Sequence, residues 1–178
     1  VTKQMSHLQM GSAQIELNFE DLPFEQWNKV GSTKIELMYK PSAQMTARPL
    51  RKIASGGEVS RVMLACKVVL GESDVCDTLV FDEVDAGVGG ATAVALAEVL
   101  AQLAKTHQVI VVTHLPQVAV MASKQYVVSK TEEHNALPIT SLTEVSGTQR
   151  EEEIARMLSG SITEASLAHA HELLSEVR

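Results

Sequence analysis

The spacing of apolar residues along this chain predicts an α/β fold that begins with a pair of strands. Residues 13–19 and 34–39 alternate apolar and polar side chains, a pattern typical of half-buried strands. Proline, asparagine and glycine occur in the connection, so we expect an antiparallel pair joined by a long loop. Residues 1–14 are polar and weakly patterned, which fits the end of a helix or a linker, and residues 41–49 are expected to form a loop.

The middle of the chain has the pattern of a strand, a helix and a second strand. Residues 78–81 and 109–113 are continuous apolar runs, as expected of strands that are buried on both faces. This order implies parallel pairing, a right-handed crossover, and a largely parallel sheet with flanking helices. A glycine-rich turn at 85–90 leads into the helix, whose apolar face comprises Ala93, Leu96, Ala97, Leu100, Leu103 and Ala104.

Another helix is predicted to precede the first of these strands. It begins at Gly56, and Gly71 ends it. Its apolar residues recur with i, i+3, i+4 spacing, which predicts a stripe that faces the core. The stripe comprises Val59, Val62, Met63, Cys66, Val69 and Leu70.

The last third of the chain continues with short elements of both kinds. We expect a short helix from Pro116 to about Met121 and strands at 125–130 and 139–145. Thr148 and Glu151 have the spacing of a capping box that opens a further helix, which ends at a glycine. The face of the last helix carries Leu167, Ala168, His171 and Leu174.

The composition indicates one globular domain with an aliphatic core. Of the 178 residues, 45% are hydrophobic, 21% are charged and only 3% are aromatic. The net charge of −7 argues against a protein that coats nucleic acid. Residues 48–67 nevertheless hold five basic side chains against one acid, which fits either a solvated face or a local patch for phosphate.

Several other classes of protein do not fit the sequence. The two cysteines predict neither a disulfide framework nor a zinc site, and Cys66, on the apolar stripe, is expected to be a buried free thiol. No apolar run reaches 18 residues and no signal peptide is apparent, so we expect a soluble, cytoplasmic protein. His171 and Glu172 begin like the zinc-protease motif H-E-x-x-H, but Ser175 takes the place of the second histidine.

The segment Ser55-Gly56-Gly57-Glu58 opens the predicted helix at Gly56. Ser55 and Glu58 have the spacing of a capping box, which explains both residues by itself. It does not explain Gly56 and Gly57, because glycine in a first helical turn costs stability. Two bare glycines expose backbone N–H groups where the helix dipole is positive, so the segment is also a candidate seat for a phosphate anion.

Three charged or polar residues follow the ends of the two central strands. Asp82 and Glu83 come directly after residues 78–81, and His114 follows residues 109–113. Ligands of such sheets gather at the carboxyl ends of the strands. Asp82 can hold Mg²⁺ and Glu83 can orient or deprotonate a water, or both carboxylates simply end a strand near solvent. His114 can donate to a phosphate oxygen, and the nearby Asp85 can face a partner or the metal.

These segments together resemble the ABC-type ATPases. Ser55-Gly56-Gly57-Glu58 is similar to their signature motif, and residues 79–83 are similar to their Walker B strand with its catalytic glutamate. Asp85 and His114 fall where the family has its D-loop and its switch histidine. Glutamate at position 58, where transporters usually have glutamine, points to the chromosome-maintenance and repair branch.

The resemblance is most specific to the RecN family of bacterial DNA repair proteins, which are SMC-like ATPases. It runs from about Leu50 to Leu174 and rests on four strings in the same order: residues 54–61, 81–90, 112–117 and 154–160. Val59 replaces the usual leucine, and Lys40-Pro41-Ser42 replaces an expected Asn-Pro-Gly turn.

The resemblance implies roles for these residues in a dimer of ATPase heads that sandwiches two ATP molecules. Ser55, Gly56 and Gly57, with Glu58 of the same motif, would bind the ATP that the opposite head holds. On its own head, Asp82 would hold Mg²⁺, while Glu83 and His114 would be catalytic. Asp85 would lie at the interface. Head closure would then be coupled to DNA held elsewhere in the nucleoid-associated assembly.

One expected motif is absent from the sequence. A Walker A loop needs G-x-x-x-x-G-K-[ST], and no glycine here is followed by lysine. The resemblance therefore implies a single domain, 1–178, equivalent to the C-terminal half of a head: residues 1–49 form a strand pair and loop, and residues 50–178 form the signature, Walker B and switch-histidine lobe. Such a chain needs an N-terminal Walker A half, should not hydrolyse ATP alone, and should expose apolar surface that favours self-association.

Two alternatives from other classes stay open. One is a Mg²⁺-dependent nuclease that uses Asp82, Glu83 and Asp85 directly. The other is a non-enzymatic module that only binds a partner.

Overall fold

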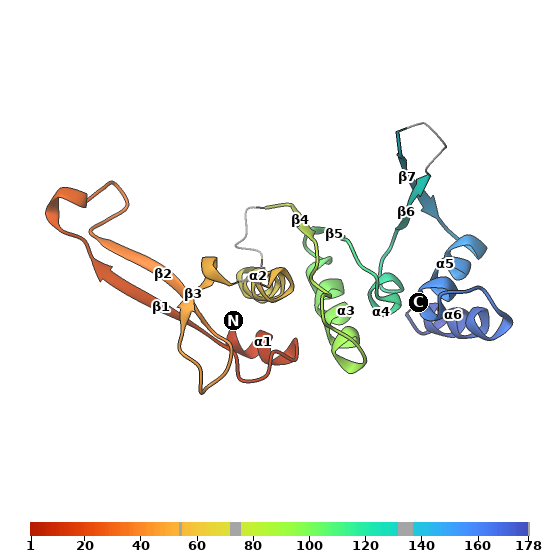
Figure 1. Cartoon of the computed structure of the whole chain (residues 1–178), viewed down its shortest axis with the longest axis horizontal. Helices are drawn as coiled ribbons and strands as arrows, with labels where there is room; N and C mark the ends of the chain where they lie inside the picture. The colour runs from red at the N-terminus through yellow and green to blue at the C-terminus, as the bar shows by residue number, and fades with distance from the viewer. Residues whose placement is uncertain (54, 72–75, 132–136, 178) are drawn as a thin grey trace. The chain divides into compact units, whose positions relative to one another are not determined.

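The computed structural model describes residues 1–53, 55–71, 76–131 and 137–177 (Figure 1). The chain divides into two compact units, Val1–Val112 and Thr113–Arg178, and each is described by itself. No helix within the described ranges is long and apolar enough to cross a membrane.

The first unit opens with a helix and a long hairpin. The elements are α1 (Thr2–His7), β1 (Gln14–Asp21), the 3-10 turn η1 (Phe24–Gln26), β2 (Thr33–Lys40) and β3 (Arg48–Pro49). β1 and β2 pair antiparallel in the register Leu17 with Leu37 and Phe19 with Ile35, which confirms the predicted strand pair. β3 adds a short third strand inside the stretch that we expected to be a loop.

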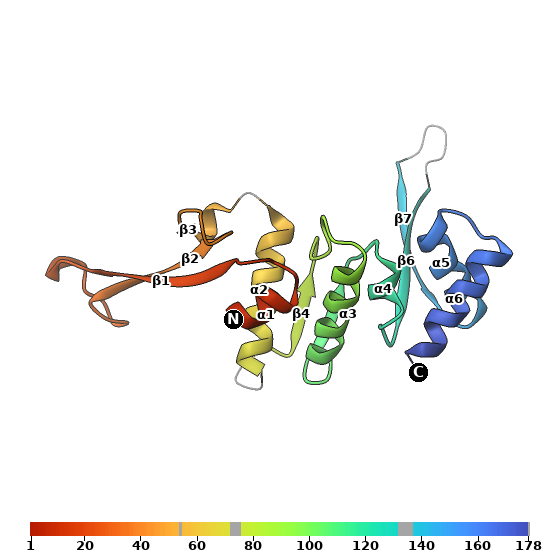
Figure 2. The same ribbon diagram turned by 90° about the horizontal axis from the view of Figure 1, so that it is seen from below.

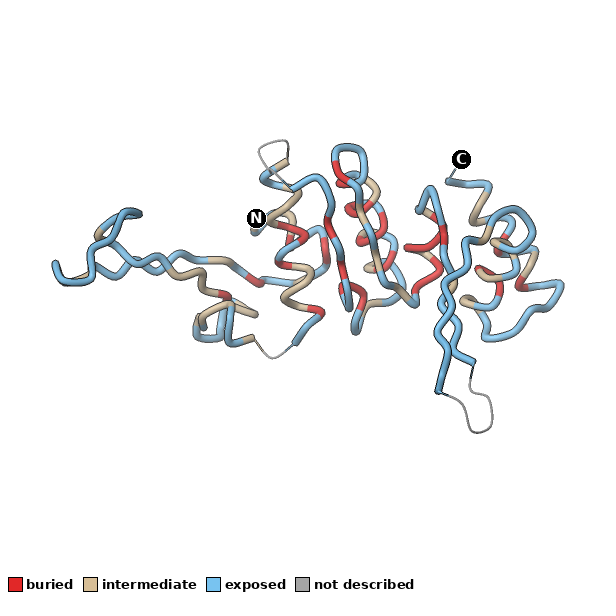
Figure 3. Tube along the Cα trace, turned by 90° about the horizontal axis from the view of Figure 1, so that it is seen from above, coloured by how far each residue is buried: buried red, intermediate tan, exposed pale blue. Residues whose placement is uncertain are grey.

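The hairpin is far more exposed than its alternating pattern predicts. Phe19 is 62% exposed, and Leu17 and Ile35 are also exposed, although all three lie on the apolar side of the ladder. Figure 3 shows exposed residues along nearly all of the outer hairpin. The prediction of half-buried strands is therefore wrong for this part, because the described elements of the unit leave the apolar side uncovered.

The rest of the first unit contains the predicted strand-helix-strand order. Its elements are η2 (Leu50–Lys52), α2 (Gly56–Leu70), β4 (Thr78–Phe81), α3 (Ala91–Leu103) and β5 (Gln108–Val111). β4 and β5 pair parallel, as predicted. This is the only parallel pairing among the described strands; the sheets β1-β2-β3 and β6-β7 are antiparallel. The fold is therefore α/β with small mixed sheets, and a largely parallel sheet is not present in the described part.

The β4–β5 sheet is buried on one face only. Leu79 is 8% exposed, whereas the next residue, Val80, is 66% exposed. On β5, Ile110 is also exposed, as is Val112 directly after the strand. Burial on both faces was expected from the apolar runs and is wrong for this chain. α3 supplies the buried residues of the covered layer, and its predicted apolar face is buried except for Ala104.

Helix α2 buries only part of the predicted stripe, together with residues outside it. Val62, Leu64 and Ala65 are fully buried, whereas Met63, Val69 and Leu70 are exposed. The helix is apolar around most of its circumference, so periodicity alone does not select the core-facing side. α1 contacts α2 (Figure 2) and contributes the buried Met5, and Leu8 directly after the helix is also buried. Residues 2–7 are therefore helical, which agrees with one of the two expectations for this stretch.

The described residues of the second unit form three helices and an antiparallel strand pair. The elements are α4 (Pro116–Ala119), β6 (Gln125–Thr131), β7 (Ile139–Val145), α5 (Thr148–Ser159) and α6 (Glu164–Glu176). α5 is preceded by Gly147 at φ 52°, and the predicted Thr148–Glu151 capping box does not form. Instead, the Glu151 Oε1 atom lies 3.3 Å from the Nδ1 atom of His171 on α6. A capping box does open α6, between Thr163 and Ser166.

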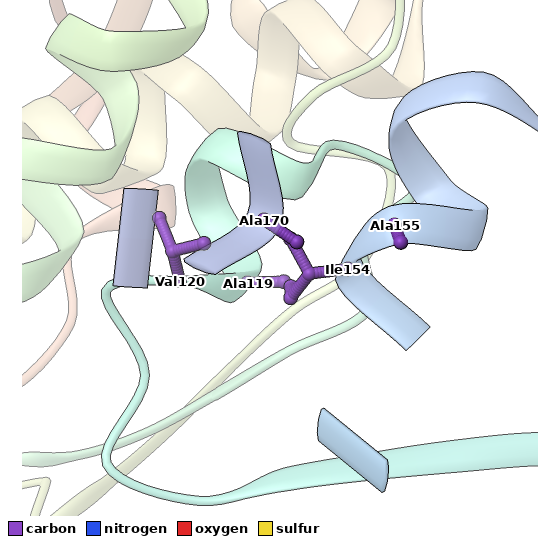
Figure 4. Packing of buried hydrophobic residues seen from close by; sticks show 5 residues of the cluster. All are labelled: Ala119, Val120, Ile154, Ala155 and Ala170. Atoms are coloured by element: carbon purple, nitrogen blue, oxygen red, sulfur yellow. The ribbon is translucent and has the colours of Figure 1, made fainter. Parts of the chain in front are cut away.

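The core of the second unit lies between α4, α5 and α6. Figure 4 shows Ile154 of α5 next to Ala119 of α4 and Ala170 of α6; Ile154 and Ala170 are fully buried. Arg150 of α5 donates to the carbonyls of Ala119 and Val120, so it caps the end of α4 and joins the two helices.

Candidate functional site

The site is built on the first turn of α2. The Ser55 hydroxyl accepts a hydrogen bond from the Glu58 N–H at 3.3 Å, so Ser55 is the N-cap, as predicted. The reciprocal bond of a full capping box is not among the hydrogen bonds of the described residues. The Glu58 side chain lines a cavity instead.

The two glycines of this turn have different surroundings. Gly57 is buried, and a Cβ atom at this position would lie 2.9 Å from the Ala86 Cβ and 3.0 Å from the Glu83 carbonyl oxygen. Gly56 is exposed, and a Cβ there would meet the Glu83 carboxylate. Close packing against residues 83–86 therefore requires glycine at position 57, which is a structural reason that the sequence pattern did not reveal.

The two adjacent carboxylates open a tight turn, residues 82–88, which we call the carboxylate turn. Asp82 and Glu83 are exposed, whereas Asp85 is only 3% exposed. Two backbone hydrogen bonds close the turn, from Ala86 N–H to the Glu83 carbonyl and from Val88 N–H to the Asp85 carbonyl, both 3.0 Å. Glu83 has a left-handed backbone (φ 56°), which costs a residue with a Cβ on the order of 1 kcal/mol or more.

Two side chains of α2 connect its second turn to the carboxylate turn. The Ser60 hydroxyl donates to the Asp82 carbonyl at 2.9 Å. The Arg61 guanidinium Nη1 donates to the carbonyls of Val84, at 3.2 Å, and Ala86, at 2.9 Å. The signature-like segment and the carboxylates of one chain are thus brought together. Sequence reasoning did not assign either residue a role, although both lie within the string 54–61; Arg61 was counted only as part of a basic patch.

A cavity of about 300 Å³ lies beside these contacts. Glu58, Arg61 and the buried Tyr39 are among the residues that line it. Burial and the nearby Glu58 carboxylate raise the pKa of the Tyr39 hydroxyl, and Arg61 partly offsets this. No sequence signal identified Tyr39, because it was expected only as part of a strand.

Two of the basic residues at 48–67 bind acceptors within the chain. Arg51 pairs with Glu36 on β2 at 2.7 Å, and Arg61 is bound to the carboxylate turn. At least these two side chains of the cluster therefore have partners within the chain. Both cysteines are free thiols, and burial raises the pKa of the half-buried Cys66.

His114 belongs to the second unit, between β5 and α4, and is exposed. The hydroxyl of the preceding Thr113 accepts from the Leu115 N–H at 3.0 Å, which shapes this connection ahead of α4. The place of His114 relative to Asp82 and Glu83 stays a prediction.

The donor set at the carboxylate turn suits a hard cation only in part. Within the described ranges, no three His, Cys, Asp or Glu side chains gather to hold a metal ion. Asp82 offers exposed carboxylate oxygens, the ligand type that Mg²⁺ prefers, but most other ligands would have to come from water or phosphate.

The chain is similar to curated bacterial proteins. It is 47% identical to the DNA repair protein RecN of Streptomyces coelicolor over 149 residues, 83% of this chain and 26% of the relative. It is 39% identical to RecN of Xylella fastidiosa over 183 residues, 99% of this chain and 32% of the relative. The chain is thus a homologue of RecN along most of its own length and spans about a quarter to a third of these relatives. No family model matches it.

Solved structures share the fold. An Smc head domain from Pyrococcus yayanosii aligns with a TM-score of 0.56 and 18% identity, over 98% of this chain and 28% of that one. A chain from work on ATP-driven dimerization and DNA-stimulated activation of SMC ATPases aligns with a TM-score of 0.51 and 19% identity, over 89% and 91%. The α/β fold therefore matches SMC ATPase head domains.

Proposed function

We propose that this homologue of the DNA repair protein RecN is the C-terminal part of an ATPase head, and that it supplies a signature segment, a Walker B strand and a switch histidine to an ATP site. The observation that carries the proposal is the joining of the α2 start to the carboxylate turn. Ser60 and Arg61 donate three hydrogen bonds from the helix to the backbone of residues 82–86. A purely structural helix cap needs no such link to a pair of exposed carboxylates.

Residues of the first unit fit the parts of a Mg²⁺–ATP complex. At the start of α2, backbone N–H groups and the helix dipole favour an anion, and the Glu83 carboxylate occupies the space that a Cβ at Gly56 would fill. Ser55, Gly56 and Gly57, with Glu58, would hold phosphate of the ATP bound to the opposite head, and Asp82 would hold Mg²⁺ at the ATP of its own head. The metal, when bound, would neutralise charge on the transferred phosphoryl group.

Two exposed side chains have the chemistry for catalysis in such a site. Glu83 is the candidate base that orients or deprotonates the water attacking the ATP of its own head, because it is exposed just after the Walker B-like strand β4. His114 is the candidate donor to a phosphate oxygen. Asp85, nearly buried within the turn, would support the head–head interface.

The exposed apolar surfaces of the first unit support the proposal that this chain is only part of a head. Val80 and Ile110 lie on the open face of the β4–β5 sheet, and Leu17, Phe19 and Ile35 lie on the open side of the hairpin. Uncovered apolar area of this kind marks an interface. We assign it to a segment that carries the Walker A loop. The chain alone should therefore self-associate, and light scattering would detect this.

Dimerisation on ATP, DNA binding and residence in the cytoplasm at the nucleoid belong to the same proposal. ATP-driven dimerization and DNA-stimulated activation are known of SMC ATPases in the work on a chain that shares this fold. We infer that a complete head containing this chain forms a homodimer on binding ATP, and that DNA contacts the full assembly.

The test is ATP hydrolysis by this chain alone and after mixing with the Walker A segment of a RecN relative. The proposal predicts no hydrolysis by either part and hydrolysis by the mixture. Hydrolysis by this chain alone would contradict it, and so would an inactive mixture in which the two parts are shown to bind each other.

The two alternatives lack a supporting observation. A nuclease would need Asp82, Glu83 and Asp85 around a metal, but Asp85 is buried and no such cluster occurs in the described part of the chain. DNA cleavage with Mg²⁺ and without ATP would revive that alternative. Indifference to nucleotide in every assembly would favour a module that only binds a partner.

A further inference from the structure

The Arg61 side chain makes an unusual pair of contacts for a residue on a helix surface. One nitrogen, Nη1, donates to the carbonyl oxygens of Val84 and Ala86. The amides closing the turn use different acceptors, the carbonyls of Glu83 and Asp85. Arg61 therefore supplies hydrogen bonds that the turn does not make for itself. Bonds from a charged donor are stronger than those between neutral groups.

These bonds hold a backbone that is unfavourable by itself. Glu83 is left-handed, at φ 56°, and a residue with a Cβ keeps this conformation only when its surroundings enforce it. Ser60 binds the carbonyl just before Glu83, and Arg61 binds the carbonyls just after it. The strained residue is thus held from both sides by consecutive residues of α2.

The same contacts keep the turn against the start of the helix. Gly57 allows the close approach, because any Cβ there would press on Ala86 and on the Glu83 carbonyl. Glycine permits this approach but supplies no side chain to hold it, whereas the Ser60 and Arg61 side chains donate hydrogen bonds to the turn.

We propose that Arg61 is a positioning residue that fixes the carboxylate turn to the signature-like helix, so that Glu83 and the start of α2 move as one body. The proposal rests on the proposed function, in which these two parts serve different ATP molecules. A rigid connection between them would make binding at one ATP site felt at the other. Arg61 itself touches neither nucleotide nor water in this account.

The first test needs only this chain. Hydrogen exchange would be compared between the wild type and Arg61→Met, which keeps the length of the side chain but removes its donors. The amides of Ala86 and Val88 should exchange at least about ten-fold faster in the variant. The Val112 amide, which donates to Phe81 in the β4–β5 sheet, should be unchanged. Equal acceleration at Val112 would mean that the variant loosens the whole unit, and would overturn the proposal, as would no acceleration at the turn.

The second test uses the complete head, formed with a Walker A segment. Arg61→Met should lower kcat at least about ten-fold, because misplacing a catalytic group is costly. KM for ATP should change by less than about two-fold, since ground-state binding does not use Arg61. Arg61→Lys keeps a charged donor and should restore part of kcat, whereas the control Arg51→Met removes only the exposed pair with Glu36.

The two tests separate failure of this proposal from failure of the proposed function. Unchanged kcat for Arg61→Met in an active head would overturn the positioning role, as would a KM increase at constant kcat. A wild-type head without ATPase activity would contradict the proposed function, while hydrogen exchange would still decide whether Arg61 holds the turn.

Discussion

The carboxylate turn and the β1–β2 hairpin lie in the same unit, yet the described residues of that unit hold the turn with hydrogen bonds and leave much of the hairpin exposed. The turn closes with its own backbone hydrogen bonds and receives three more from Ser60 and Arg61. The hairpin has a full ladder, but Leu17, Phe19 and Ile35 remain exposed along it. The polar groups of the turn are thus satisfied within this chain, whereas the apolar side of the hairpin is left uncovered by the described residues.

This difference has a physical basis. A polar turn is satisfied by hydrogen bonds from residues close by, here within one helix. Apolar faces need area from another layer, and an isolated two-stranded hairpin is marginal in water. A segment of a larger head is expected to show this combination, and an independent module is not.

The largest effect is expected for a substitution in the carboxylate turn. In a complete head, Glu83→Gln should lower kcat by about a hundred-fold or more, the usual scale for loss of a general base. ATP-driven dimerisation should persist, because the amide keeps the shape of the side chain. Steady-state hydrolysis and analytical ultracentrifugation measure the two properties. Glu98→Gln, on the exposed side of α3, is the matched control, and full turnover in the Glu83 variant would remove Glu83 from this role.

Two neighbouring residues of β4 lie on opposite faces of the β4–β5 sheet: Leu79 on the buried face and Val80 on the exposed face. Leu79→Ala should lower the free energy of unfolding by about 2–5 kcal/mol, because Leu79 is buried. Val80→Ala, on the open face of the same strand, should cost less than about 1 kcal/mol. Urea denaturation of the chain compares them, and equal costs would show that the open face is covered in solution.

Gly56 and Gly57 at the start of α2 test how closely this helix packs against the carboxylate turn. Gly57→Ala should destabilise the chain by about 1–3 kcal/mol, because its Cβ would press on Ala86 and on backbone. Gly56→Ala should cost less than about 1 kcal/mol, since the atom that it meets belongs to the flexible Glu83 side chain and alanine favours the helix. Thermal denaturation of both variants decides this, and the reverse order would argue against the observed packing.

The smallest effect concerns the cavity beside the turn. The Tyr39 pKa is raised above its ordinary value of 10.0, chiefly by burial, so the folded state holds the phenolic proton more tightly than the unfolded state. The stability linked to this bound proton is fully present at neutral pH, and the free energy of unfolding falls as the pH rises through the raised pKa of Tyr39. Tyr39→Phe removes this titrating group, so the free energy of unfolding of the variant should fall less steeply than that of the wild type above about pH 10. Urea midpoints between neutral and alkaline pH measure this, and identical slopes would contradict it.

Local signals in the sequence predicted most elements and the order of the candidate site residues. Strand 78–81 and the face of α3 agree with the structure, because apolar runs and i, i+4 spacing are local properties. Burial on both faces of the strand failed, since it depends on a covering layer that the described residues do not supply. The stripe on α2 was right only in part, with Val62 buried and Met63 and Val69 exposed, because a helix that is apolar on most sides does not indicate which side is covered.

The connections within the site could not be predicted. Arg61 and Ser60 reach across more than twenty positions of sequence to single carbonyl oxygens, and no spacing rule announces such contacts. The string 54–61 marked the region, but it did not separate a residue that binds a ligand from one that holds the site together.

The central claim is tested most directly by mixing two defective complete heads. One carries Ser55→Arg, which blocks the signature-like segment, and the other carries Glu83→Gln. If that segment serves the ATP of the opposite head, each homodimer is inactive, and a mixed dimer has one intact site. The mixture should then recover up to about a quarter of wild-type hydrolysis, since half of the dimers are mixed and each has one working site of two. No recovery, with mixed dimers shown to form, would contradict the account.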